Sequence, residues 1–88
     1  MEFEWDEVKR VTNLAKHGLD FADVARFGWD AAQFKRDLRH DYGEDRFIAV
    51  GGLDGRLVAV AFTPRNGITR IVSMRPASRR ERVRHDSV

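Results

Sequence analysis

The spacing of apolar and polar residues changes about one third of the way along the chain. Residues 6–28 carry apolar side chains three and four positions apart, which is the spacing of one helix face. Residues 34–74 instead contain short runs rich in β-branched and aromatic residues, and turn sequences separate these runs. The pattern therefore predicts helices first and a sheet after them.

Two helices are predicted before residue 30. Asp6 is suited to cap a helix that runs to about His17, and Gly18 suits the left-handed position that ends it. Asp20 caps a shorter second helix that ends near Gly28. The residues predicted to be buried are Val8, Val11, Leu14 and Ala15 in the first helix, and Phe21, Val24, Ala25 and Phe27 in the second.

Four strands are predicted over residues 34–39, 46–51, 57–63 and 68–74. Connections as short as theirs force antiparallel hairpins. Ser78 and Glu81 have the spacing of a capping box, which opens a third, basic helix. We therefore predict one α+β domain over residues 1–88 in the order ααββββα. Two helices pack on a four-stranded antiparallel sheet, and a short helix lies at its C-terminal end.

Residues 57–62 are apolar at both alternating sets of positions, so both faces of this strand are apolar. Two N-terminal helices cover only one face of a sheet. The other face is covered by the last helix or left partly open as a docking surface. We expect it to be partly open, with a basic rim.

Composition excludes several classes of site. The chain has no cysteine, so it holds no disulfide, thiol nucleophile or zinc finger. Its three histidines lack the spacing of metal ligands, and its glycines form no phosphate-binding loop, so no metal or cofactor is expected. The longest apolar run is too short to span a bilayer, and the acidic N-terminus is unlike a signal peptide. We expect a cytoplasmic protein without a membrane partner.

Charge divides unevenly between the two halves of the chain. Residues 1–45 carry seven lysines and arginines against eleven acids, a net charge of −4. Residues 46–88 carry nine arginines, no lysine and three acids, a net charge of +6. Arginine gives planar, bidentate contacts with phosphate or carboxylate. The second half therefore predicts an anionic partner, either nucleic acid or an acidic protein surface.

One predicted hairpin gathers groups that suit RNA cleavage. His40 and Glu44 are each placed to act as a base toward a 2′-hydroxyl group, and Arg46 is placed to stabilise charge on the phosphate. Arg39 lies beside His40. The alternative is that Glu44 and Arg46 form a structural ion pair, since residues two apart in a strand share a face. His17 also suits proton transfer, although we favour a role in ending the first helix.

Arginines at the last strand and helix form a second candidate set. Arg75 is predicted to hold the scissile phosphate, because its strand leads directly into the basic helix. For Arg75, and for Arg65 and Arg70 near the same strand, the alternative is that they are solvated side chains that deter aggregation. A helix face that is simply solvated is the alternative for the C-terminal arginines. The residues assigned to RNA binding are Arg39, Arg65, Arg70, Arg79, Arg80 and Arg82.

Four segments together resemble one known family. They are residues 3–6 with Asn13, residues 16–18 and Phe21; residues 41–47; Thr63 with Ile71; and residues 73–82. Their order and spacing are similar to those of BrnT toxins. The resemblance implies a RelE-like fold and a metal-independent endoribonuclease that inhibits translation and growth. It also implies neutralisation by a BrnA-type antitoxin encoded beside the toxin.

The resemblance further implies that the antitoxin supplies most contacts with operator DNA, within a toxin–antitoxin hetero-oligomer. Composition and residue pattern alone leave a second hypothesis open. In it, the chain is a non-catalytic, arginine-rich module that binds nucleic acid or protein as part of a repressor complex.

Overall fold

The computed structural model describes residues 1–39 and 41–87. It confirms the predicted α+β class, with one more strand than expected. In chain order the elements are β1 (Phe3–Trp5), α1 (Glu7–His17), the 3₁₀ helices η1 (Phe21–Arg26) and η2 (Trp29–Ala31), β2 (Gln33–Arg36), β3 (Phe47–Leu53), β4 (Arg56–Arg65), β5 (Ile68–Pro76) and α2 (Arg79–Asp86).

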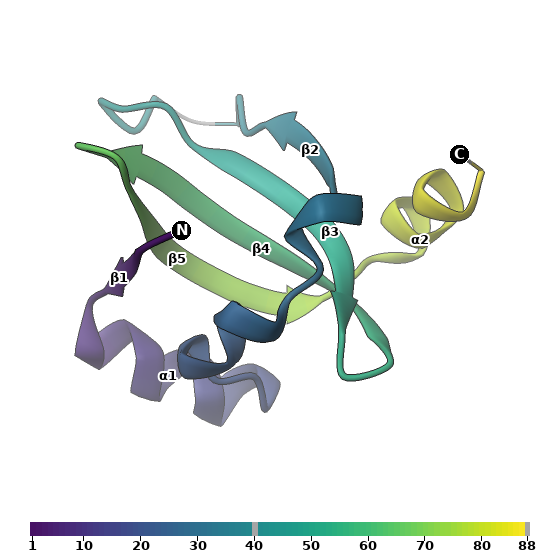
Figure 1. The fold of residues 1–88 in the computed structure, drawn as a ribbon, viewed down its shortest axis with the longest axis horizontal. Helices are drawn as coiled ribbons and strands as arrows, with labels where there is room; N and C mark the ends of the chain where they lie inside the picture. The colour runs from purple at the N-terminus through teal and green to yellow at the C-terminus, as the bar shows by residue number, and fades with distance from the viewer. Residues whose placement is uncertain (40, 88) are drawn as a thin grey trace.

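The sheet has five strands in the order β1-β5-β4-β3-β2 (Figure 1). Antiparallel pairing joins β2 to β3, β3 to β4 and β4 to β5, as the short connections predicted. The prediction of four antiparallel strands was wrong at one edge, where β1 pairs with β5 in parallel. A strand of three residues is too short to show an alternating pattern, so the spacing of apolar residues does not indicate β1.

The predicted second helix is a 3₁₀ helix rather than an α-helix. Phe21, Val24 and Phe27 are buried as expected, whereas Ala25 is exposed. Phe21 and Val24 are three residues apart, and the three residues per turn of a 3₁₀ helix place them on one side, while Phe27 directly follows the helix in extended conformation. Side chains of η1 thereby cover one face of the sheet. They pack against Val60 of β4 in the main core.

Aromatic rings extend this core toward β2. The ring of Trp29 lies 4.8 Å from that of Phe27, 5.5 Å from that of Phe62 and 5.6 Å from that of Phe3, centroid to centroid. Its indole N–H donates to the carbonyl of Val24 at 3.0 Å. Trp29 is therefore part of the aromatic packing on this face of the sheet.

The predicted buried face of α1 is wrong. Val8, Val11, Leu14 and Ala15 are all exposed, and Asn13 is the residue of this helix that is buried. Asn13 donates to the carbonyl of Leu19 and accepts from the backbone N–H of Met74, both at 3.1 Å. β1 pairs with β5 only over residues 69–71, and α1 packs against β5 beyond these residues. Polar side chains of α1 therefore face backbone groups of β5 that no neighbouring strand pairs.

The ends of α1 follow the prediction. The carboxylate of Asp6 accepts the N–H groups of Val8 and Lys9, and Gly18 ends the helix with φ of 69°. This left-handed conformation is one that glycine adopts without strain.

The second face of the sheet is defined by strand register. Lys35, Ile48, Ala61 and Ser73 lie in one row across β2, β3, β4 and β5. The next row contains Gln33, Val50, Ala59 and Arg75. We call this side of the sheet, which is opposite the aromatic core, the arginine face.

Helix α2 lies at one end of the arginine face, beyond β3 (Figure 1). It begins with the predicted capping box, since the hydroxyl of Ser78 accepts the N–H of Glu81 and the Glu81 carboxylate accepts the N–H of Ser78. A small apolar cluster of Ile48, Val50, Ala59 and Ala77 is buried on this side. The second face is thus only partly covered by a helix, and basic side chains lie over its remainder.

Candidate functional site

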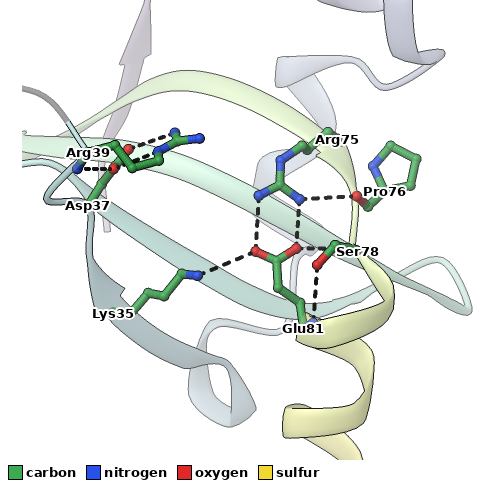
Figure 2. A network of polar contacts seen from close by, with 7 residues as sticks. All are labelled: Lys35, Asp37, Arg39, Arg75, Pro76, Ser78 and Glu81. Atoms are coloured by element: carbon green, nitrogen blue, oxygen red, sulfur yellow. Dashed lines mark hydrogen bonds and ion pairs between the residues drawn. The ribbon is translucent and has the colours of Figure 1, made fainter.

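Arg75 is held by a buried carboxylate at the end of β5. Its two terminal nitrogens donate to the two oxygens of Glu81 at 2.6 and 3.0 Å, and one also donates to the carbonyl of Pro76 at 3.3 Å (Figure 2). The Arg75 guanidinium and the N–H of Ser78 lower the pKa of Glu81 from 4.5 to about 2. Glu81 is therefore ionised at neutral pH, and it fixes both the guanidinium and the start of α2.

A second arginine is held in the same way beside β2. Arg39 donates from Nε and from one terminal nitrogen to the two oxygens of Asp37, both at 2.9 Å. The Asp37 side chain is only 1% exposed, and it also accepts from the hydroxyl of Tyr42 at 3.2 Å. Hydrogen bonds from Arg39 hold the pKa of this carboxyl well below its usual range.

The two arginines line one shallow hollow on the arginine face. Its other lining residues are Ile48, Ala59, Ala61 and Ser73. The volume of this hollow is only about 20 Å³, so it is a shallow depression beside the two guanidinium groups and not an enclosed cavity. Within residues 1–39 and 41–87, Arg39 donates twice to Asp37 and also contacts Tyr42, and Arg75 donates twice to Glu81 and once to the Pro76 carbonyl. A guanidinium has five N–H donors. Both groups thus keep donors for an anion.

Lys35 adds a third cation near this hollow. Its ammonium lies 3.9 Å from the Glu81 carboxylate, on the side opposite Arg75 (Figure 2). Counting Arg39, Arg75 and Lys35 against Asp37 and Glu81, the cluster keeps one net positive charge. The cluster can therefore attract an anion while each guanidinium stays oriented by its carboxylate.

The predicted catalytic residues do not all lie together. Glu44 forms a bidentate pair with Arg65 at 3.1 and 3.2 Å, which joins the β2–β3 connection to the β4–β5 turn. Glu44 therefore pairs with Arg65, and not with Arg46 as the predicted alternative had it. The Arg46 guanidinium instead lies 3.6 Å over the ring of Tyr42. His40 lies outside the described residues.

Arg46 has one further feature. Its Nε–H is buried and, among residues 1–39 and 41–87, has no hydrogen-bond acceptor. A buried donor without a partner carries a free-energy cost. The backbone of Arg46 is held next to the end of β2, because its carbonyl accepts from the N–H of Asp37 at 2.8 Å.

The predicted RNA-binding arginines have different surroundings. Arg70 pairs with Glu4 at 2.6 Å, where β1 meets β5. Arg79, Arg80 and Arg82 are all exposed on α2, but only Arg80 lines the groove of about 440 Å³ between this helix and β2. Arg84, one turn later, lines the same groove.

Three residues of the cluster were missed as site residues by the sequence analysis. Lys35 lies in β2, Asp37 comes directly after it, and Glu81 was interpreted only as a capping residue. Of these three residues, Glu81 is the one that the sequence could have indicated as a partner of Arg75. It follows Arg75 by six residues, and its capping box marks the point where the chain turns from the strand into the helix. Nothing in the sequence shows that Asp37 is buried.

The described residues show neither a metal-ligand cluster nor a helix that spans a membrane. Residues 1–39 and 41–87 contain no group of three or more His, Cys, Asp or Glu side chains placed to hold a metal ion. Over the same residues, no helix has the length and apolar content needed to cross a bilayer.

The fold is an α+β domain, and it carries guanidinium groups that buried carboxylates orient on one face of its sheet. Comparison with family models identifies it more closely. The model described as "Ribonuclease toxin, BrnT, of type II toxin-antitoxin system" matches residues 5–81, so the chain belongs to the BrnT family of ribonuclease toxins. Comparison with curated proteins gives no match. A type II toxin acts together with an antitoxin, which is therefore the partner that this membership implies.

Proposed function

We propose that this chain is a metal-independent endoribonuclease whose RNA site is the arginine face. The observation that carries the proposal is the shared hollow of Arg39 and Arg75, each oriented by a buried carboxylate. Donors fixed before the reaction stabilise developing charge without the cost of reorientation. We place the phosphodiester over Ala59, Ala61 and Ser73, because these residues line the hollow that Arg39 and Arg75 share.

The reaction that fits this arrangement is a transfer within RNA. A base removes the proton of the 2′-hydroxyl, and the 2′-oxygen attacks the neighbouring phosphorus. The bond from phosphorus to the 5′-oxygen breaks, and an acid protonates that oxygen. The products are a 2′,3′-cyclic phosphate and a 5′-hydroxyl group. Arg75 and Arg39 stabilise the negative charge that develops on the phosphate oxygens.

We assign the proton-transfer roles to His40 and Glu44, with Arg46 as an additional cation. His40 follows Arg39 directly, and its ordinary pKa of about 6.5 suits both acid and base roles at neutral pH. Glu44 is the alternative base, although its bidentate pair with Arg65 ties its two oxygens. Arg46 follows Glu44 by two residues, and its guanidinium lies over the ring of Tyr42, which keeps a positive charge close to these groups.

The remaining arginines are proposed to contact phosphates on either side of the cleaved bond. Arg80 lines the groove beside Lys35 and Glu81, which leads away from the hollow along α2. Arg65 and Arg70 lie toward the opposite end of the strands. Arg79 and Arg82 are exposed outside the groove, so we assign them weaker contacts than that of Arg80.

The cognate antitoxin is proposed to be of the BrnA type and to carry a DNA-binding domain. In this proposal the antitoxin binds operator DNA, and the toxin joins it as a co-repressor in a hetero-oligomer. Membership of a type II toxin family supports the pairing. The net charge of +6 over residues 46–88 supports an anionic or acidic partner for the toxin.

The decisive experiment is cleavage of a labelled RNA in excess EDTA. We expect cleavage to persist and to leave 2′,3′-cyclic phosphate ends. Arg39→Ala is expected to lower kcat/KM by about 100-fold, which is typical for loss of one preorganised donor. Arg26→Ala is the matched control, because Arg26 is also paired with carboxylates, those of Asp23 and Asp54.

Loss of cleavage in EDTA with recovery on adding magnesium would contradict the metal-independent mechanism. Equal activity of Arg39→Ala and Arg26→Ala would contradict the placement of the site. RNA binding without any cleavage would favour the non-catalytic module instead.

A further inference from the structure

Helix α1 presents an apolar stripe to solvent. Val8, Val11 and Leu14 are 75%, 55% and 40% exposed, and Ala15 is exposed beside them. Positions three and four apart lie on one side of a helix, so these residues form one continuous surface. We call this surface the α1 stripe. Its exposure adds nothing to the stability of this fold, and contiguous exposed apolar surface marks an interaction site.

A groove runs along one side of the α1 stripe, between α1 and β5. Its volume is about 310 Å³. Lys9 and Lys16 are two turns apart on the same side of α1, and both line the groove. The other lining residues are Val8, Thr12, Asn13, His17, Val72 and Ser73. The described lining thus contains two lysines and no carboxylate, and apolar residues border it.

The groove reaches the arginine face. Ser73 lines both this groove and the hollow that holds Arg39 and Arg75. A segment that lies along α1 and continues past Ser73 therefore arrives over the proposed RNA site without crossing another element of the fold.

We propose that the α1 stripe and its groove are the docking site for an acidic, amphipathic segment of the antitoxin. The proposal rests on the proposed function, since it takes the antitoxin as the occupant. Apolar side chains of the segment cover Val8 and Val11, and its carboxylates lie beside the two lysines. Its continuation past Ser73 covers Arg39 and Arg75, so that RNA is excluded.

Charge favours this occupant over a second copy of the chain. When two identical helices pack face to face in antiparallel orientation, equivalent flanks meet each other. Lys9 of one copy would then lie beside Lys16 of the other, and like charges at such positions oppose pairing. RNA is disfavoured as the occupant because the stripe itself is made of valine, leucine and alanine.

The test uses the full-length toxin and, as probe, the purified protein encoded by the neighbouring reading frame. We expect Val11→Asp to weaken binding of this protein by at least tenfold in a calorimetric titration. Val83→Asp is the matched control, because Val83 is 59% exposed on α2. It should change the Kd by less than twofold. RNA cleavage by either variant alone, and its melting temperature, should equal those of the unmodified toxin.

The charge contribution is tested separately with Lys9→Glu combined with Lys16→Glu. This double variant is expected to bind the antitoxin about tenfold more weakly at low salt. The difference from the unmodified toxin should shrink at high salt, because exposed charges are then screened. Arg56→Glu, an exposed charge reversal on β4 outside the groove and outside the residues assigned to RNA, serves as its control.

Equal Kd values for Val11→Asp and Val83→Asp would overturn the proposal. Sedimentation of the toxin alone as a dimer that Val11→Asp dissociates would assign the stripe to a second copy instead. Loss of RNA binding in the lysine double variant would assign the groove to RNA. If the toxin fails to cleave any RNA but Val11→Asp still weakens antitoxin binding, the docking site stands and only the catalytic proposal fails.

Discussion

The two faces of this sheet are formed by the same strands, yet they differ in nearly every physical respect. On one face, Phe21 and Val24 of η1 and Phe27 directly after it pack with aromatic rings to form the main core. On the other, the floor consists of small residues, and Arg39 and Arg75 lie over it. Successive residues of a strand alternate between these faces.

The difference between the faces shows how the chain separates stability from function. The core face buries large side chains, which gives most of the hydrophobic stabilisation. The arginine face keeps its charged groups in place with buried carboxylates, and such pairs contribute little net stability by themselves. Their effect is to hold each guanidinium in one orientation, which is what the proposed binding of a phosphodiester requires.

The largest expected effect on stability comes from the core face. Phe21 is fully buried, so Phe21→Ala should lower the free energy of unfolding by about 3–5 kcal/mol. Urea unfolding measures this change. Phe34→Ala removes a ring that is 53% exposed and should cost only about 1 kcal/mol. A small effect of Phe21→Ala would contradict the assignment of the main core.

On the arginine face, Arg75→Ala should affect stability as well as cleavage. It leaves the buried Glu81 carboxylate without its bidentate partner, which should cost about 3 kcal/mol. Adding Glu81→Gln removes the unpaired charge and keeps a residue suited to the capping box. The double variant should therefore recover most of the melting temperature of the unmodified chain.

Cleavage, however, should stay low in both Arg75 variants, because the guanidinium is absent from each. This pair of measurements separates the structural role of Arg75 from its proposed role in catalysis. Recovery of activity together with stability in the double variant would show that Arg75 acts only through the fold.

Acid should weaken the arginine face before the core face. The pKa of Glu81 is about 2 in the folded chain, below its ordinary 4.5. The stabilisation from this shift is fully present above about pH 4.5 and is lost as the pH falls toward 2. It amounts to up to about 3 kcal/mol. Asp37, whose pKa is also lowered by its arginine, adds a loss of the same sign.

The check is urea unfolding of the unmodified chain and of Glu81→Gln between pH 7 and pH 2. The free energy of unfolding of Glu81→Gln should fall less steeply below pH 4.5. Parallel curves for the two proteins would contradict the ion pair as the structure shows it.

A smaller effect is expected where α1 meets β5. Asn13→Ala removes the partner of the Met74 N–H and of the Leu19 carbonyl. Leaving these buried groups unpaired should cost about 1–3 kcal/mol. Thr12→Ala, at an exposed neighbouring position, is the control and should change stability by less than about 0.5 kcal/mol. Equal melting temperatures of the two variants would contradict the buried position of Asn13.

The sequence predicted the elements of this fold well where local chemistry decides them. The Asp6 and Asp20 caps, the Gly18 end of α1 and the capping box at Ser78 are all confirmed. The antiparallel pairing of the last strands followed from short connections. Each of these features depends on residues that are close together in the chain.

Features that depend on distant residues were not predictable in this way. The apolar spacing of α1 indicated a buried face at Val8 and Val11, but this helix packs against a strand edge that offers polar groups to Asn13. Likewise, Arg75 was chosen because its strand leads into the basic helix and Arg39 because it lies beside His40, but their carboxylate partners depend on tertiary structure. The face of the sheet on which a charged residue lies depends on how the strands pair, and this pairing register joins residues far apart in the chain.

The central claim is that RNA binds on the arginine face, and arginine side-chain resonances test it most directly. The toxin, labelled with nitrogen-15, is titrated with a 2′-O-methyl RNA that cannot be cleaved. We predict that the Nε–H signals of Arg39 and Arg75 shift, whereas that of Arg26 and the amide signals of α1 do not. Shifts confined to Arg26 or α1, with Arg39 and Arg75 unchanged at saturation, would contradict the account.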